Sequence, residues 1–258
     1  HVLVLPGIYV QNATLVVPEE ISLEGSGASY TRIVGQPGQP VMELGGWNEI
    51  ANLTVEGGLD GMAWHENDLT GFAVHDVWFV DQAGAPLLMP GGGYIELEFE
   101  RNVIVRPRFP VEILVEGDSE VWIRNNHFVG TATEDYLKIT FEGNGLFGNL
   151  EVTNNIFENG SEALDVFAYT TQPMVVQVAN NTFNDNLNGL TVECLDMDSV
   201  LLEVQNNWFH DNWLGADFGA CSLFVQAAGW LDYNGWGLNT TDLGGATWGA
   251  HALFDTPT

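Results

Sequence analysis

The sequence has very few basic residues: six lysines and arginines stand against 35 aspartates and glutamates, giving a formal net charge of −29. Binding to nucleic acid needs lysine and arginine at the phosphates, so this charge argues against a nucleic-acid partner and against docking on an anionic membrane. No run of about 18 apolar residues occurs, so membrane insertion is not expected. Hydrophobic residues still make up 45% of the chain, which predicts a buried core rather than disorder.

Helical periodicity is also missing. No window combines apolar residues at helical spacing with helix caps, because glycine or asparagine interrupts nearly every candidate. Short alternating stretches such as Val175–Val178 instead predict strands with one buried face. Clusters of Asn, Asp and Gly between them, such as residues 184–189, predict turns. The pattern therefore indicates an all-β protein.

A box of two asparagines recurs along the chain. The segments that begin at Ile123, Val152, Val178 and Val204 each read aliphatic, any residue, Asn, Asn, any residue, Phe. Weaker copies begin near residues 50, 74, 99 and 231, so the repeat averages about 26 residues. A leucine-rich repeat would need a different consensus, and a propeller blade would need about 40 residues. Short strands stacked on identical neighbours predict a β-solenoid.

The box gives a physical reason for stacking. Successive coils of a solenoid lie about 4.8 Å apart, so an inward asparagine can bond to its copies above and below and satisfy the backbone groups of the turn. The phenylalanine of each box would stack in the core in the same way. The expected ladder and stack comprise Asn126, Asn155, Asn181, Asn207, Phe128, Phe157, Phe183 and Phe209.

Inward asparagine with stacked phenylalanine at a coil turn resembles the right-handed parallel β-helix of the pectin-lyase-like superfamily. The segments V-L-P-G-I-Y-V, I-S-L-E-G-S-G and T-R-I-V-G near the amino end resemble the opening coil of such proteins. The resemblance covers essentially the whole chain and implies a right-handed parallel β-helix of about nine or ten coils. We expect a single domain over residues 1–258, with coils over residues 1–231 and a Gly- and Trp-rich cap over residues 232–258.

The catalytic motifs of the related enzymes are missing. The polygalacturonase and pectin esterase signatures do not occur, and the nearest match to a pectate lyase motif, Arg106-Pro107-Arg108, has the wrong spacing. Residues 65–66 share only the His-Glu of the alginate-epimerase-like motif. We therefore expect a secreted or surface-exposed structural or adhesive module that binds polysaccharide or other cell-surface glycans. The alternative is a polysaccharide hydrolase or lyase with an unfamiliar carboxylate site.

Two pairs of aspartates fall in register. Asp185 and Asp211 occupy adjacent coils, about 4.8 Å apart, near the separation of the two carboxylates in a retaining glycosidase. Asp165 and Asp217 are two coils apart, about 9.6 Å, near the upper end of the inverting range. An acidic repeat also produces such pairs by coincidence. Asp185 and Asp211 could instead bind calcium, which prefers oxygen ligands; no other cofactor is expected.

Three tryptophans near turns or outward strand positions could stack on sugars, although packing in the core or cap is the alternative. They are Trp122, Trp208 and Trp213. Five of the six basic residues fall between residues 101 and 138, where they would either bind a sugar acid or pair with neighbouring acids. The ends or faces of a solenoid also offer surfaces for self-assembly.

Cys194 and Cys221 are 27 residues apart, one coil period. Stacked positions lie inside the distance window of a disulfide, so we expect a bridge; two unrelated buried thiols are the alternative. A bridge implies an oxidising compartment and therefore an extracellular or cell-surface location. The acidity fits either a secreted protein in calcium-containing medium or a halophilic one.

Overall fold

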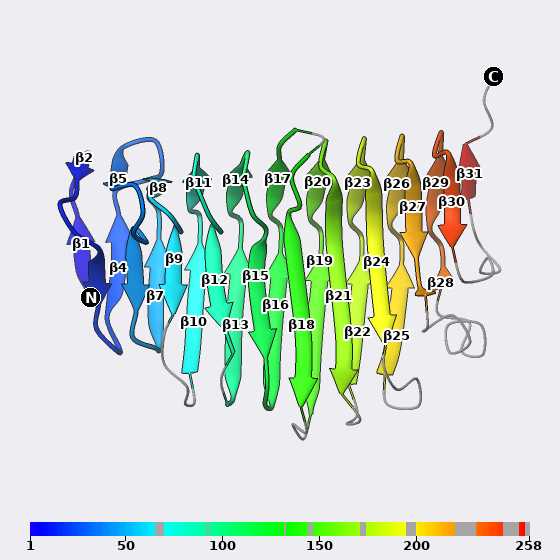
Figure 1. The fold of residues 1–258 in the computed structure, drawn as a ribbon, viewed down its shortest axis with the longest axis horizontal. Coiled ribbons are helices and arrows are strands. Elements are labelled where there is room, and N and C mark those ends of the chain that lie inside the picture. The colour runs from blue at the N-terminus through cyan, green and yellow to red at the C-terminus, as the bar shows by residue number, and fades with distance from the viewer. Residues whose placement is uncertain are drawn as a thin grey trace.

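The computed structural model describes residues 1–64, 70–91, 93–131, 133–143, 147–170, 174–194, 200–219, 231–244 and 253–255. These ranges contain 31 strands and no α-helix. The strands stack coil upon coil along one long axis, with β1 at one end and β31 at the other (Figure 1). The predicted all-β solenoid is confirmed. No helix in the described part of the chain has the length and apolar character needed to cross a bilayer.

Each of the first ten coils contributes one strand to each of three parallel sheets, which we call A, B and C, and β31 adds an eleventh strand to sheet B. Sheet A contains, in spatial order, β1 (Val2–Val4), β4 (Ser22–Gly25), β7 (Asn48–Ala51), β10 (Thr70–His75), β13 (Ile95–Glu100), β16 (Ser119–Arg124), β19 (Gly148–Thr153), β22 (Met174–Ala179), β25 (Val200–Gln205) and β28 (Leu231–Asp232). Sheet B contains β2 (Gly7–Val10), β5 (Thr31–Gly35), β8 (Thr54–Gly57), β11 (Trp78–Val80), β14 (Val103–Val105), β17 (His127–Val129), β20 (Ile156–Glu158), β23 (Thr182–Asn184), β26 (Trp208–His210), β29 (Gly235–Gly237) and β31 (Leu253–Asp255). Sheet C contains β3 (Leu15–Val17), β6 (Met42–Leu44), β9 (Met62–Trp64), β12 (Leu87–Pro90), β15 (Val111–Val115), β18 (Leu137–Gly143), β21 (Glu162–Thr170), β24 (Asn188–Cys194), β27 (Leu214–Asp217) and β30 (Thr241–Gly244).

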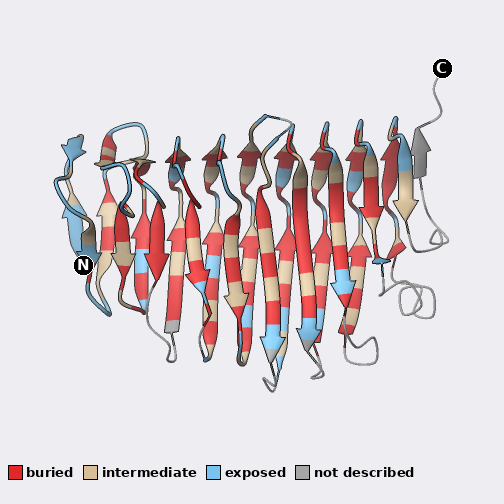
Figure 2. Cartoon of the chain, viewed as in Figure 1, coloured by how far each residue is buried: buried red, intermediate tan, exposed pale blue. Residues whose placement is uncertain are grey.

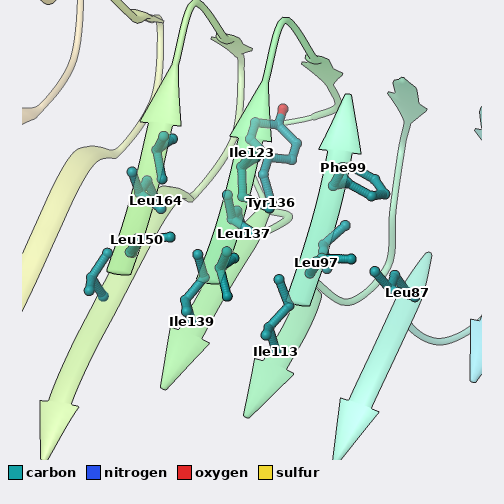
Figure 3. Close-up of a cluster of buried hydrophobic side chains, with 14 of the residues drawn as sticks. Leu87, Leu97, Phe99, Ile113, Ile123, Tyr136, Leu137, Ile139, Leu150 and Leu164 are labelled. Carbon is teal, nitrogen blue, oxygen red and sulfur yellow. The ribbon is translucent and has the colours of Figure 1, made fainter. Parts of the chain in front are cut away.

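Side chains alternate between the core and the solvent along each strand, as the banding in Figure 2 shows. Leu97, Val121 and Leu150 lie opposite one another on β13, β16 and β19 and are fully buried. Figure 3 shows Leu97 and Leu150 among the aliphatic side chains of this core. Because neighbouring coils stay in register, the outward residues also form straight rows that step about 4.8 Å per coil.

The first asparagine of each box makes the turn and the second makes the ladder. Asn154 has a φ of 59°, the left-handed conformation that asparagine tolerates better than most residues. Next to it, the buried Oδ1 of Asn155 accepts a 2.9 Å hydrogen bond from the backbone N–H of Asn126. Bonds of the same kind link the ladder in the order Val77, Asn102, Asn126, Asn155, Asn181, Asn207 and Asn234.

The box phenylalanines form a continuous stack in the core, next to the asparagine ladder. Ring centroids lie 4.7 Å apart for Phe128 and Phe157, 5.0 Å for Phe157 and Phe183, and 4.8 Å for Phe183 and Phe209. Trp236 continues the stack at 4.5 Å from Phe209. The coils thus continue past residue 231, where the repeat was expected to give way to a cap, because β29 and β30 extend sheets B and C. A tryptophan in place of phenylalanine and a single Asn in that box weaken the sequence pattern there.

Candidate functional site

The outer face of sheet A carries a dense group of carboxylates. Glu49 lies opposite Ala73, which lies opposite Glu98, so the three form one outward row on β7, β10 and β13. In the adjacent row, Gly71 is followed by Glu96 and then Glu120. Two tryptophans border this region, Trp47 just before β7 and Trp122 opposite Glu98 on β16. We call these side chains the acidic face: Trp47, Glu49, Glu96, Glu98, Glu120 and Trp122.

A groove of about 290 Å³ opens at one end of the acidic face. Trp47 forms one wall of the groove, and Glu49, Glu96 and Glu98 line it with carboxylates. The remaining lining includes Gly71 and Ala73, whose small size keeps the sheet surface open between the carboxylates. The groove therefore combines one large aromatic ring with three acidic groups and is shallow enough to be reached from solvent.

Local backbone geometry fixes the position of Trp47. Its φ is 52°, in the left-handed region, and the turn is closed by the N–H of Gly46, which donates to Oδ1 of Asn48 at 2.9 Å. The buried amide of Asn48 donates to the carbonyl oxygens of Pro18 and Ile21 in the preceding coil at 2.7 and 3.0 Å. The first bond closes the turn and the other two tie it to the preceding coil, so the backbone that carries the indole is fixed before any ligand binds.

Gly71 provides the seat for the Trp47 ring. A Cβ atom at Gly71 would lie 2.6 Å from Cε3 and Cζ3 of the indole, closer than real carbon contacts allow. Only glycine therefore lets the ring lie against the sheet at this point. Trp47 remains 46% exposed in this position, which leaves a fixed aromatic surface facing solvent.

The carboxylates of the groove differ in their internal partners. Glu49 lies 3.1 Å from Nε2 of His75, whose Nδ1 lies 2.9 Å from Asp76. Burial alone would lower the pKa of His75, but the hydrogen bonds to Asp76 and Glu49 outweigh it and raise that pKa. Within the described part of the chain, Glu98 receives no hydrogen bond or ion pair. The groove thus keeps at least one exposed carboxylate without a counter-ion from the described residues.

At the other end of the acidic face, Trp122 lies between Glu98 and Glu151 in the outward row. The guanidinium of Arg124 lies 5.5 Å from the centroid of the Trp122 ring and pairs with Glu151. Trp122 was predicted to bind sugars from its outward position, and the structure places it on the same face as Trp47. Whether it contacts a ligand stays a prediction.

The other two predicted tryptophans lie elsewhere. Trp208 is on β26 of sheet B, with its ring centroid 6.0 Å from that of His210. Trp213 lies just before β27 and is 61% exposed. The structure does not bring either of them to the acidic face, because each belongs to a different side of the solenoid from sheet A.

Asp185 and Asp211 occupy turns after β23 and β26. Their φ values of 55° and 54° place both in the left-handed conformation, which accounts for short polar side chains at these positions. The residue after each is part of a second buried ladder, in which Asn186 accepts from Gly160, and Asn212 accepts from Asn186, each at 3.0 Å. These asparagines face inward, so their oxygens do not join the aspartates as calcium ligands. The described residues contain no group of three or more His, Cys, Asp or Glu side chains suited to a metal ion.

Asp165 and Asp217 share an outward row of sheet C with Thr191 between them, in the register expected from the sequence. Asp165 is nevertheless only 6% exposed. Burial, followed by the hydrogen bond to and the charge of neighbouring Glu162, raises the pKa of Asp165 to about 8. The Asp165 carboxyl therefore keeps its proton at neutral pH, because a second charge beside Glu162 in a buried position would be unfavourable.

Four of the five basic residues between 101 and 138 pair with acids on adjacent coils, and Arg108 has no acidic partner among the described residues. Lys138, the only lysine, lies 3.5 Å from Glu112 and 5.8 Å from the ring centroid of Phe167. The arginine pairs are Arg101 with Asp76, Arg106 with Asp81 and Arg124 with Glu151. Of the two interpretations of this cluster, the geometry favours local pairing over a site for a sugar acid.

Cys194 ends β24 and is buried. Its predicted partner, Cys221, lies outside the described residues. The disulfide between them, and the extracellular location inferred from it, stay predictions.

A protein-family model described as a right-handed beta helix region matches residues 46–229, which is most of the chain. The chain belongs to the right-handed β-helix family. Among solved structures, this β-helix is similar to the A-module of the mannuronan C-5 epimerase AlgE6 from Azotobacter vinelandii. The two share 13% identity and a TM-score of 0.43, over 99% of this chain and 91% of that chain. Comparison of the sequence with curated proteins finds no relative.

The groove of this β-helix was not predicted from the sequence. Trp47 follows two glycines and precedes Asn48, and Gly71 lies 24 residues further on, about one coil later. A glycine one coil after an exposed tryptophan is a pattern that could have indicated a ring lying flat on the next strand. The same arrangement recurs on sheet B, where a Cβ atom at Gly235 would clash with the Trp208 ring, but no box contains a residue equivalent to Trp47, so the periodicity did not reveal the groove.

Proposed function

We propose that this β-helix binds a polysaccharide on the acidic face of sheet A and acts as an extracellular or cell-surface binding module. The observation that carries the proposal is the Trp47 indole, held over Gly71 beside a groove of about 290 Å³. An exposed aromatic ring packs against the apolar face of a sugar, while nearby polar groups bind its hydroxyls. Glu49, Glu96 and Glu98 supply those acceptors.

The rigidity of the groove supports binding. The turn of Trp47 is fixed by the hydrogen bonds of Asn48, so little conformational freedom of the protein is lost when a ligand binds. Outward rows that run along the solenoid also suit a long polymer, because successive sugars can contact successive coils. Trp122 lies further along the same face, where it would extend the surface available to the polymer.

Replacing Trp47 with alanine is expected to weaken polysaccharide binding about tenfold or more, because the ring contributes the largest apolar contact in the groove. Gly71→Val should weaken binding as well, since a side chain there displaces the indole. Affinity electrophoresis against a panel of neutral, acidic and cationic polysaccharides measures the effect. Trp213→Ala removes an indole that is at least as exposed but lies outside the face, and it should leave binding unchanged. The proposal fails if no polysaccharide is retarded, or if Trp47→Ala and Trp213→Ala behave alike.

A second candidate function is polysaccharide cleavage at sheet C. The protonated Asp165 could donate a proton to a glycosidic oxygen, and Asp217, two coils away, could activate water as in an inverting hydrolase. The burial of Asp165 opposes this function, because its carboxyl would have to reach a substrate through the covering side chains. Binding without cleavage therefore has the stronger structural support.

Assays for new reducing ends and for unsaturated products decide between the two functions. We expect no turnover by the wild-type protein on any polysaccharide that it binds. Turnover that disappears in Asp165→Asn but persists in Asp185→Asn, a matched change in an exposed turn, would replace the binding proposal by hydrolysis at sheet C.

A further inference from the structure

We infer that the polymer recognised by the acidic face is built from amino sugars, whose ammonium groups pair with Glu49, Glu96 and Glu98 beside the Trp47 ring. This inference rests on the proposed function, since it concerns the same groove. It adds the chemical class of the ligand, which neither the fold nor the exposed tryptophan specifies.

The charge of the groove is the first argument. The described residues that line it include three glutamates and neither lysine nor arginine. A polymer of uronic acids would meet these carboxylates on a protein of net charge −29 and would be repelled. A neutral polymer would leave the mutual repulsion of the carboxylates unrelieved, whereas a cationic polymer neutralises it.

The described part of the chain does not supply the missing counter-ions. The nearest cations beside sheet A are already engaged: Arg101 pairs with Asp76 and Glu100, and Arg124 pairs with Glu151. His75, at the edge of the groove, pairs with Glu49. Glu98 is exposed and, among the described residues, has no partner at all. An external cation is therefore the group that would complete this site.

Trp47 fits the same ligand. Indole is the best of the aromatic rings at attracting a cation over its face, and this attraction grows when the cation is partly withdrawn from water. An amino sugar presents both an apolar ring face for stacking and an ammonium group for the indole and the carboxylates. The combination of one exposed indole with three surrounding carboxylates selects for a ligand that has both features.

The spacing of the carboxylates suits a repeating polymer. Glu49 and Glu98 occupy the same row with Ala73 between them, so they are two coils, about 9.6 Å, apart. That separation is comparable with the two-sugar repeat of an extended chain. A basic peptide fits less well, because β10 is paired with both β7 and β13 and offers no free strand edge to which peptide backbone could bond.

The test compares glucosamine oligomers with their N-acetylated counterparts and with cello-oligosaccharides of the same length. Calorimetry is done at a pH at which the amines are protonated. We expect the glucosamine oligomers to bind about tenfold more tightly than the N-acetylated ones, because acetylation removes the charge. The preference should shrink as salt is added, since the charges are exposed. Glu98→Gln should reduce the preference, Trp47→Ala should weaken binding of every oligomer, and Glu142→Gln on sheet C should change neither.

Each outcome separates the two proposals. Equal binding of charged and neutral oligomers that still depends on Trp47 would overturn the amino-sugar inference and leave polysaccharide binding intact. Failure of every oligomer and polysaccharide to bind would overturn both. Binding of oligolysine that is as tight and as dependent on Trp47 would show that the ligand is a basic peptide and would also overturn the inference.

Discussion

Replacing Asn155 with alanine is expected to lower the free energy of unfolding by about 3–5 kcal/mol. Asn155 lies in the middle of the ladder and is 1% exposed. Its Oδ1 accepts from the backbone N–H and from Nδ2 of Asn126, and its Nδ2 donates to the carbonyl oxygen of Ile123 at 2.8 Å. Alanine leaves several of these buried groups without a partner, and each such group costs about 1–3 kcal/mol.

Urea unfolding followed by circular dichroism measures this loss. The control is Asn154→Gly, one residue away, because Asn154 is exposed and glycine adopts its φ of 59° without strain. That variant should stay within about 0.5 kcal/mol of the wild type. Equal midpoints for the two variants would show that the ladder orders the turns without stabilising the fold.

The second large effect concerns pH. The free energy of unfolding is expected to decrease as the pH rises from about 4 to about 8, because the pKa of Asp165 is raised by burial and by neighbouring Glu162 to about 8. The folded state then holds a proton that the unfolded state releases at the ordinary carboxyl pKa. The stabilisation is complete below that ordinary value and is lost as the pH passes through the raised one. Because a tenfold difference in proton affinity between the folded and unfolded states is worth about 1.4 kcal/mol, the loss is on the order of 5 kcal/mol.

Asp165→Asn isolates this contribution, since the amide resembles the protonated carboxyl but does not titrate. Unfolding midpoints measured between pH 4 and pH 9 should fall less steeply for this variant, which should be more stable than the wild type at the alkaline end. Asp185→Asn, in an exposed turn, should keep the slope of the wild type. If both variants show the wild-type slope, Asp165 does not carry the proton.

The asparagine ladder and the phenylalanine stack could be predicted because the same box recurs in successive coils. Asn155 and Phe157 recur one coil later as Asn181 and Phe183, and a parallel solenoid places equal positions on top of each other. One period of the chain therefore contains the information for the next. The register of Asp165 with Asp217 followed from the same logic.

The groove depends on a combination of features that does not repeat. Trp47 needs its own left-handed turn, the amide of Asn48 and the missing side chain of Gly71 in the following coil. Coil lengths vary along the chain, so the residue that stacks on a given position in the next coil cannot be identified by adding a fixed number of residues. The raised pKa of Asp165 was hidden for a similar reason, because it depends on burial and on neighbouring Glu162 rather than on the place of Asp165 in the row.

Asp185 and Asp211 show that the same residue type can have either a ligand-binding or a structural role. An aspartate in a turn can bind a metal ion, or it can simply adopt the left-handed backbone conformation that the turn requires. The sequence alone does not distinguish these two roles. Only the φ values of 55° and 54°, with inward asparagines beside them, show that the turn itself uses these residues.

The strict register of the sheets places the outward side chains at regular intervals along the axis of the solenoid. Each coil advances every outward row by the same step of about 4.8 Å, whatever its loops do. Duplicating or deleting one whole coil of about 26 residues between Trp47 and Trp122 would therefore change their separation by one step of about 4.8 Å. The asparagine ladder and the core would keep the same contacts from coil to coil. A change in the spacing of a bound polymer could be matched by adding or removing coils, without redesigning any of them.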